Sequence, residues 1–138
     1  MAKKIDLEKI LAALGSDEAR SQAISQLVGK VELSTPQIKR IVEDYEKAGR
    51  FGKAADVALE AGMTDRAIEV YEKAGRFYDA ANVALEAGMT DRANKLYVRV
   101  VEDYEKEGRF GKAVDVALEA GMTDRAEQLK TLVDLINS

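Results

Sequence analysis

The ten-residue sequence ALEAGMTDRA occurs three times in this chain, at Ala58–Ala67, Ala84–Ala93 and Ala117–Ala126. The first two copies start 26 residues apart, and the second and third start 33 residues apart. Read from Tyr45 in rows of 13, every row has glycine at its fifth place and alanine at its tenth, with one seven-residue interruption at Tyr97–Asp103. The chain is therefore built on a 26-residue repeat that consists of two half-units.

Each half-unit predicts one short helix. Its apolar residues follow the spacing of one helical face, as in Ala54, Val57, Ala58 and Ala61. The glycine that follows, such as Gly62, is expected to end the helix in the left-handed conformation. Thr64 is expected to cap the next helix, with Asp65 in the first turn at the positive end of the helix dipole.

The alternate joint reads Gly-Arg-Phe, at Gly49–Phe51, Gly75–Phe77 and Gly108–Phe110. We expect its phenylalanine to pack as a wedge between neighbouring helices, although an aromatic ring can also stack on a ligand. Helices after this joint are apolar almost all round and should be sandwiched, whereas the others carry interspersed charges and should be more exposed. Helices this short are marginal in isolation, so stacking on neighbours must stabilise them.

The interruption lengthens one helix. Seven residues make two helical turns, so the insertion roughly keeps the apolar face in register. We predict a single helix of about 17 residues over Asp91–Glu107. It is similar to an earlier helix predicted from Pro36 to Ala48, with Thr35 as its cap and Pro36 in its first position.

The predicted fold is all-α, a right-handed α-solenoid of about nine short antiparallel helices. Residues 1–138 are expected to form a single helical-repeat domain, with repeats over 35–129. N-terminal capping helices are expected within 1–34, over Asp6–Leu14 and Asp17–Val28, and a C-terminal capping helix over 124–138. That last helix is rich in apolar residues near its end (Leu132, Val133, Leu135 and Ile136), so it can either cap the stack or pair with another chain.

The composition narrows the classes of function. The chain has no histidine, which is the commonest general base and metal ligand, and no cysteine for a disulfide or a thiolate site. Its 21 basic and 25 acidic residues are mixed along the chain, so no basic footprint for nucleic acid or anionic lipid is visible. We therefore expect a cytoplasmic protein that is not an enzyme and has no cofactor, bound metal, nucleic-acid partner or membrane partner.

The order helix, Gly-x-aromatic-x-x-Ala, helix resembles that of tetratricopeptide-like α-solenoids. It is carried by Gly49-Arg50-Phe51 with Ala54, Gly75-Arg76-Phe77 with Ala80, and Gly108-Arg109-Phe110 with Ala113. The segment Tyr71–Gly88 also looks like the short helix pairs of clathrin- and coatomer-type solenoids. The resemblance covers about Thr35–Leu129, with a period of 26 residues in place of the 34 of the tetratricopeptide family. It implies partner binding on a concave or edge surface.

Carboxylates are the candidate functional groups. They recur on the helices that follow the Gly-Arg-Phe joint, as the i, i+4 pairs Asp56/Glu60 and Asp115/Glu119 and as Glu86, whose i−4 neighbour is Asn82. Stacked helices could align them into an acidic ridge that docks a basic peptide or weakly holds a divalent cation. The alternative is that these carboxylates form only the solvated edge of an otherwise apolar helix.

Two further features are candidates for partner binding. Tyr78 replaces Gly52 and Gly111 of the sister units, so packing of the repeat does not require it, and tyrosine is favoured at binding hot spots. The alternative is that the Tyr78 side chain only fills a gap on the surface. The repeated arginines are Arg66, Arg92 and Arg125. They can bind phosphate or carboxylate groups, or they can pair with acidic residues of adjacent units.

The sequence favours a non-catalytic protein-interaction or scaffold module, with a protein or peptide partner. Self-assembly into a homo-oligomer through the apolar C-terminal helix is the alternative. The near-identity of the copies also indicates recent duplication or an engineered sequence.

Overall fold

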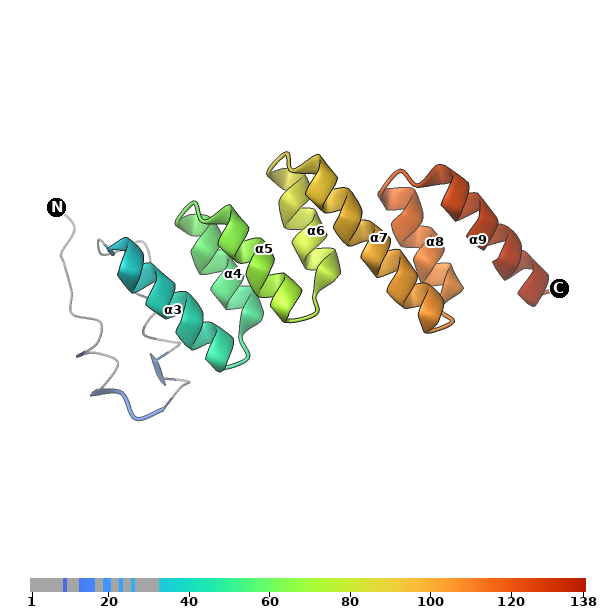
Figure 1. The fold of residues 1–138 in the computed structure, drawn as a ribbon. Coiled ribbons are helices and arrows are strands. Elements are labelled where there is room, and N and C mark those ends of the chain that lie inside the picture. Colours follow the sequence, from blue (N-terminus) through green and yellow to red (C-terminus); the bar gives the residue numbers. More distant parts are fainter. Residues whose placement is uncertain (1–8, 10–12, 17–18, 21–22, 24–25, 27–32) are drawn as a thin grey trace. The chain divides into compact units, whose positions relative to one another are not determined.

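The computed structural model describes residues 9, 13–16, 19–20, 23, 26 and 33–138. This part of the chain is all-α, with seven helices and no strand (Figure 1). The helices are α3 (Thr35–Lys47), α4 (Phe51–Glu60), α5 (Thr64–Lys73), α6 (Phe77–Glu86), α7 (Thr90–Lys106), α8 (Phe110–Glu119) and α9 (Thr123–Ile136).

The described residues thus form seven helices, and not the nine that we predicted. The two additional helices were expected over Asp6–Leu14 and Asp17–Val28, which lie largely outside the described residues. At the start of the second, the Ala19 N–H donates to the Ser16 hydroxyl at 3.1 Å.

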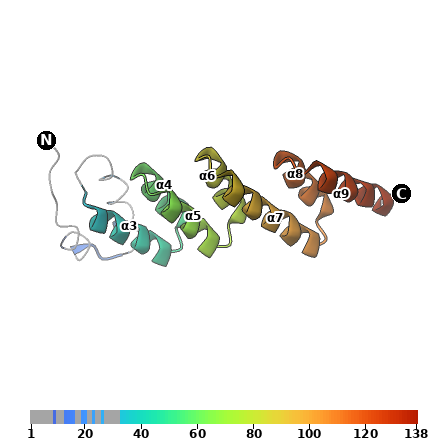
Figure 2. The ribbon, with the colours of Figure 1, turned by 45° about the horizontal axis from the view of Figure 1, so that its top comes forward.

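The chain divides into two compact units, Met1–Val70 and Tyr71–Ser138, and the division falls within α5. In the first unit α3 packs on α4, and in the second α6 packs on α7, α7 on α8 and α8 on α9. Figure 2 shows the pairs α6–α7 and α8–α9 side by side from a second direction. The prediction that consecutive helices pack in chain order is therefore confirmed within these units.

The glycines end the helices as predicted. After α4, the Gly62 N–H donates to the Leu59 carbonyl at 3.0 Å and the Met63 N–H donates to the Ala58 carbonyl at 2.8 Å. These two bonds define a Schellman ending, which requires a left-handed residue at the glycine. The six joint glycines have φ between +73° and +77°; they are Gly49, Gly62, Gly75, Gly88, Gly108 and Gly121.

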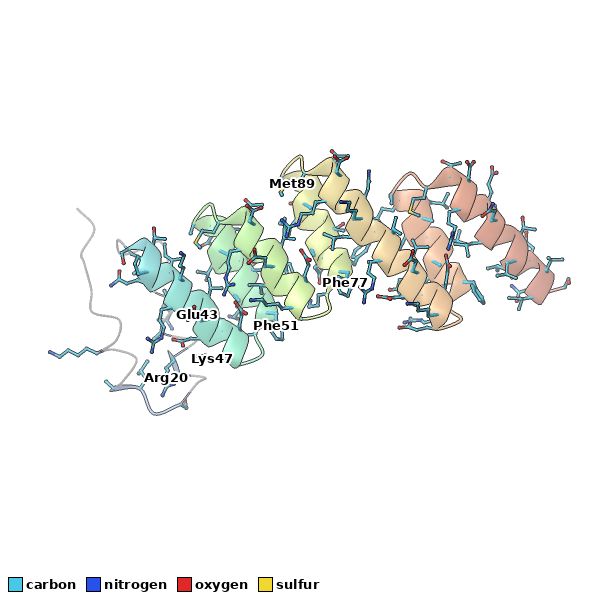
Figure 3. The ribbon with its side chains drawn as sticks, in the orientation of Figure 1. Arg20, Glu43, Lys47, Phe51, Phe77 and Met89 are labelled. Carbon is cyan, nitrogen blue, oxygen red and sulfur yellow. The ribbon has the colours of Figure 1, made fainter. Side chains whose placement is uncertain are left out.

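The prediction that threonine caps the following helix is wrong. Helices α5, α7 and α9 begin at the threonine itself. The N-cap residues of α7 and α9 are Met89, which is labelled in Figure 3, and Met122, and neither forms a side-chain capping bond. The methionine joins two helices at once. The Met89 N–H donates back to Ala84 at 2.8 Å, while its carbonyl accepts from Ala93 at 2.9 Å. Because the methionine already occupies the N-cap position, the threonine after it is the first residue of the second helix.

The start of α3 differs from the prediction by one residue. Ser34, not Thr35, is the N-cap, and Pro36 is the second residue of the helix. The Ser34 hydroxyl accepts from the Gln37 N–H at 3.3 Å, and the Gln37 side-chain oxygen accepts from the Ser34 N–H at 2.8 Å. This reciprocal capping box satisfies two otherwise unpaired donors, which Thr35 with Ile38 could not do.

Alanine fills the contact positions of the even-numbered helices, and α4, α6 and α8 each bury an alanine at the same place with no exposed surface; these residues are Ala58, Ala84 and Ala117. The phenylalanines that open these helices are half-buried, as labelled for Phe51 and Phe77 in Figure 3. The even-numbered helices are nevertheless not covered all round, because the leucine after each of these alanines is exposed.

Candidate functional site

The candidate site begins on α6. Tyr78, Asn82 and Glu86 are spaced four residues apart, which places them on one face of this helix. Two of the three are specific to α6, because the sister helices have glycine in place of Tyr78 and aspartate in place of Asn82.

Tyr97 of α7 packs against this face. Its hydroxyl donates to the Asn82 side-chain oxygen at 2.6 Å. The rings of Tyr97 and Tyr78 meet edge to face, with centroids 6.2 Å apart and planes at 72°. Tyr97 is 2% exposed and Tyr78 is 37% exposed. The inner tyrosine therefore supports the outer one, which presents its ring to solvent.

Glu119, the last residue of α8, closes the site. The Tyr78 hydroxyl lies 2.6 Å from each oxygen of the Glu119 carboxylate and donates to it. The two residues are 41 positions apart in the chain, at the start of α6 and the end of α8.

The length of α7 explains how these two ends meet. This helix has 17 residues where α5 has 10. Seven extra residues at 1.5 Å each move the start of α8 about 10 Å along the axis of α7. The chain reverses direction at each joint (Figure 1). The shift is therefore in the direction that brings the end of α8 toward the start of α6, where Tyr78 meets Glu119.

We call Tyr78, Asn82, Glu86, Tyr97 and Glu119 the tyrosine–glutamate cluster. Its hydrogen bond to Glu119, followed by desolvation, raises the pKa of Tyr78 above its ordinary value of 10.0. Burial raises the pKa of Tyr97, and the charges of Glu119 and Glu86 add to this effect. Both hydroxyls therefore remain protonated donors at neutral pH, and neither is prepared to act as a base or a nucleophile.

The cluster contains two carboxylates, those of Glu86 and Glu119. Among the described residues, no lysine or arginine forms an ion pair with Glu86 or Glu119. Helix α6 itself contains no basic residue. The Tyr78 hydroxyl therefore contacts a carboxylate that no basic side chain of the described residues neutralises.

The remaining predicted carboxylates lie apart from this network. Asp56 and Glu60 are exposed on α4, in the first compact unit, and Asp115 is exposed on α8. Within the described part of the chain, none of the three forms an ion pair. Of the six predicted site residues, only Tyr78 and Glu119 are brought into direct contact, with Glu86 near enough to influence Tyr97.

The repeated arginines pair with acidic residues, as one of the two sequence interpretations proposed. Each reaches the glutamate 20 positions earlier, and the pairs are Arg66–Glu46 at 2.7 Å, Arg92–Glu72 at 2.9 Å and Arg125–Glu105 at 2.6 Å. In the last pair a second bond of 2.8 Å makes the contact bidentate. These arginines connect successive odd-numbered helices.

Sequence reasoning missed two parts of the site. The sequence did not indicate Tyr97 as a site residue, because Tyr71 has the same place in the repeat and Tyr97 therefore looks like an ordinary repeat residue. A second set of arginines was also missed. Their guanidinium groups lie over aromatic rings, in the pairs Arg76–Tyr71 at 5.0 Å, Arg99–Phe77 at 4.6 Å and Arg109–Tyr104 at 5.1 Å. The recurring Tyr-x-x-x-x-Arg spacing could have revealed two of these pairs.

A shallow pocket of about 220 Å³ adjoins the cluster, between the start of α6 and the end of α7, and Tyr78 is part of its lining. The acidic residues of this pocket are already paired. Asp79 lies 2.8 Å from Arg76, Asp103 lies 3.3 Å from Arg99, and Glu107 lies 3.5 Å from Arg109. The unpaired negative charge thus belongs to the tyrosine–glutamate cluster and not to the pocket.

Comparison with protein-family models, with curated proteins and with solved structures finds no match to this chain. Among the residues that the structure describes, no three histidine, cysteine, aspartate or glutamate side chains are grouped to hold a metal ion. None of the described helices combines the length and the apolar character needed to cross a bilayer.

Proposed function

We propose that this protein is a non-catalytic protein-interaction or scaffold module of the helical-repeat type. The proposal includes a right-handed, tetratricopeptide-like superhelix, whose handedness an experimental structure of the full chain would test. It also includes a cytoplasmic location, which fluorescence imaging of the tagged full chain would test.

The observation that carries the proposal is a repeated exposed Leu-Glu pair at the end of each even-numbered helix: Leu59–Glu60, Leu85–Glu86 and Leu118–Glu119. The three leucines are 37%, 50% and 59% exposed, although the alanine before each is fully buried. Helix stacking uses the alanines and leaves the leucines in solvent. We assign partner contact to these exposed apolar side chains because they recur at the same place in each repeat.

Selection from a displayed library of random peptides tests this function. We expect the wild-type chain to enrich peptides whose binding falls at least about tenfold when the three leucines are replaced. The test variant is Leu59→Ser, Leu85→Ser and Leu118→Ser. The control variant changes exposed residues of odd-numbered helices, Lys73→Ser, Lys95→Ser and Gln128→Ser. Failure to enrich any peptide, or equal binding by both variants, would contradict the proposal.

Self-assembly through α9 is a second candidate, supported by its exposed apolar residues. Leu132, Leu135 and Ile136 are 37%, 67% and 59% exposed. Aligned from their shared TDRA start, α7 has the polar residues Arg99, Glu102 and Asp103 at these three places. The apolar patch is therefore an addition to the repeat.

Light scattering after size-exclusion chromatography tests self-assembly. If α9 pairs with a second copy, the wild-type chain is an oligomer and Leu135→Glu is a monomer, since the substitution buries a charge in the apolar contact. A wild-type monomer at high protein concentration would exclude this candidate. Lys130→Glu, at an exposed position of the same helix, is the matched control.

A further inference from the structure

We propose that the tyrosine–glutamate cluster is a docking site for a lysine or arginine side chain of a partner protein, whose neighbouring apolar side chain packs on Leu118. This inference rests on the proposed interaction function and assigns its ligand chemistry. It concerns only the second compact unit, which contains the whole cluster.

The first argument is that the cluster is not needed to build the repeat. The sister helices α4 and α8 fold with Gly52 and Gly111 where α6 has Tyr78. Asn82 likewise replaces the aspartate of the sister helices and accepts the Tyr97 hydrogen bond without adding a third charge. Helix α6 therefore carries side chains whose contacts serve this site.

The second argument is charge complementarity. Three glutamates of the odd-numbered helices, Glu46, Glu72 and Glu105, are each paired with an arginine of this chain. In the described part of the chain, Glu86 and Glu119 have no such cation. A basic side chain from outside would complete here the pairing that the chain makes for itself elsewhere.

The third argument is the exposed aromatic ring. In this unit, Tyr71, Phe77 and Tyr104 each have a guanidinium group 4.6–5.1 Å from the ring centroid. No such group is found over Tyr78 among the described residues. Tyr78 is 37% exposed, and its side chain contacts Tyr97 and Glu119. A cation over this ring would gain both the attraction of the π face and that of the adjacent carboxylate.

The fourth argument selects a protein side chain over a free cation. Leu118, which is 59% exposed, is the neighbour of Glu119 in the chain, and Leu85, which is 50% exposed, is the neighbour of Glu86. A peptide segment with a basic residue next to an apolar one can satisfy both parts of this surface. A small cation would leave the leucines uncovered.

The test uses the peptide most enriched by the wild-type full chain and measures its affinity by fluorescence polarisation. We expect this peptide to contain lysine or arginine beside an apolar residue. Replacing that basic residue by glutamine, or introducing Glu119→Gln or Tyr78→Gly in the protein, should each weaken binding by about tenfold or more. Tyr78→Gly installs the residue of the sister units, and circular dichroism checks that it folds.

Two matched variants separate the parts of the site. Tyr78→Phe keeps the ring and loses the hydroxyl, so it should retain more of the binding than Tyr78→Gly does. Glu43→Gln changes an exposed carboxylate of α3 in the first unit, outside the tyrosine–glutamate cluster and the Leu-Glu pairs, and it should leave the affinity unchanged.

Enriched peptides that lack a basic residue would overturn this inference and leave the interaction function intact. The same holds for peptides whose affinity is equal for wild type, Glu119→Gln and Tyr78→Gly. Failure to enrich any peptide would instead count against the interaction function itself. If Glu119→Gln abolished self-association of the chain, a second copy would be the occupant of this surface and the inference would be wrong.

Discussion

At the scale of single residues, the glycines of the second unit have two distinct roles. Gly121 ends α8 with φ of +74°, whereas Gly111 lies inside α8 without a positive φ. A Cβ atom added at either position would meet no other atom within 4 Å. The two sites therefore have equal space for a methyl group and differ in backbone conformation alone.

This difference predicts opposite effects of the same substitution. Gly121→Ala should destabilise the protein by about 1–2 kcal/mol, because alanine resists the left-handed conformation. Gly111→Ala should stabilise it by about 0.5–1 kcal/mol, because alanine favours the helix. Urea unfolding followed by circular dichroism measures both free energies of unfolding. Changes of the same sign would show that backbone conformation does not control these sites.

The two tyrosines of the cluster predict a loss of stability in alkaline solution. Both have a pKa above the ordinary value of 10.0 in the folded chain. They are harder to ionise when folded than when unfolded, so their contribution is complete below pH 10 and is lost as the pH rises through the folded pKa values. The advantage of wild type over Tyr78→Phe should be constant below about pH 9 and shrink above pH 10. Urea unfolding of both proteins across this range measures it, and parallel curves would contradict the assignment.

At the scale of helices, the length of α7 determines which residues meet. Deleting Tyr97–Asp103 leaves TDRANKLYEK, a ten-residue helix that matches α5 in length. Tyr104 would take the place of Tyr97, and α8 would move back by about 10 Å. We therefore expect the Tyr78–Glu119 hydrogen bond to be lost while the other helices remain.

A double-mutant cycle with Tyr78→Phe and Glu119→Gln measures this loss. In wild type we expect a coupling free energy of about 0.5–1 kcal/mol, since the hydrogen bond is charge-assisted but exposed. In the deletion variant the coupling should vanish. An unchanged coupling would mean that α7 does not control the register of α6 and α8.

This helix also shows how far the sequence could lead. The repeat predicted a single helix of about 17 residues over Asp91–Glu107, and α7 spans Thr90–Lys106. Tyr78 and Glu119 were each identified as candidates, but their contact was not predicted. Periodicity predicts which face of a helix is apolar. It does not predict how far the longer α7 shifts α8 along the helix axis, and this shift brings the end of α8 to the start of α6. The threonine caps were wrong for a related reason, since the composition of a joint does not show that one methionine serves two helices.

At the scale of the whole chain, we expect each helix to be stabilised mainly by its contacts with the helices next to it. Helices of the second unit pack in chain order, so each buries its apolar face against the helices next to it. The free energy of such an array is approximately a sum of helix and neighbour terms. The single domain predicted over residues 1–138 stays a prediction, and the cooperativity of unfolding is the property that would decide it.

A cavity created at a buried residue of α9 should therefore lower the stability of the chain only locally. Leu129 is 6% exposed, and Leu129→Ala should cost about 2–5 kcal/mol. Because α9 packs on α8, we expect faster amide hydrogen exchange in α8 and α9, and unchanged exchange in α3 and α4. Leu132→Ala, at a position 37% exposed in the same helix, is the matched control and should leave exchange nearly unaltered. Mass spectrometry of peptic fragments resolves these segments. Equal acceleration in all seven helices would show that the chain unfolds as one cooperative body, and that neighbour-by-neighbour stability is the wrong description of it.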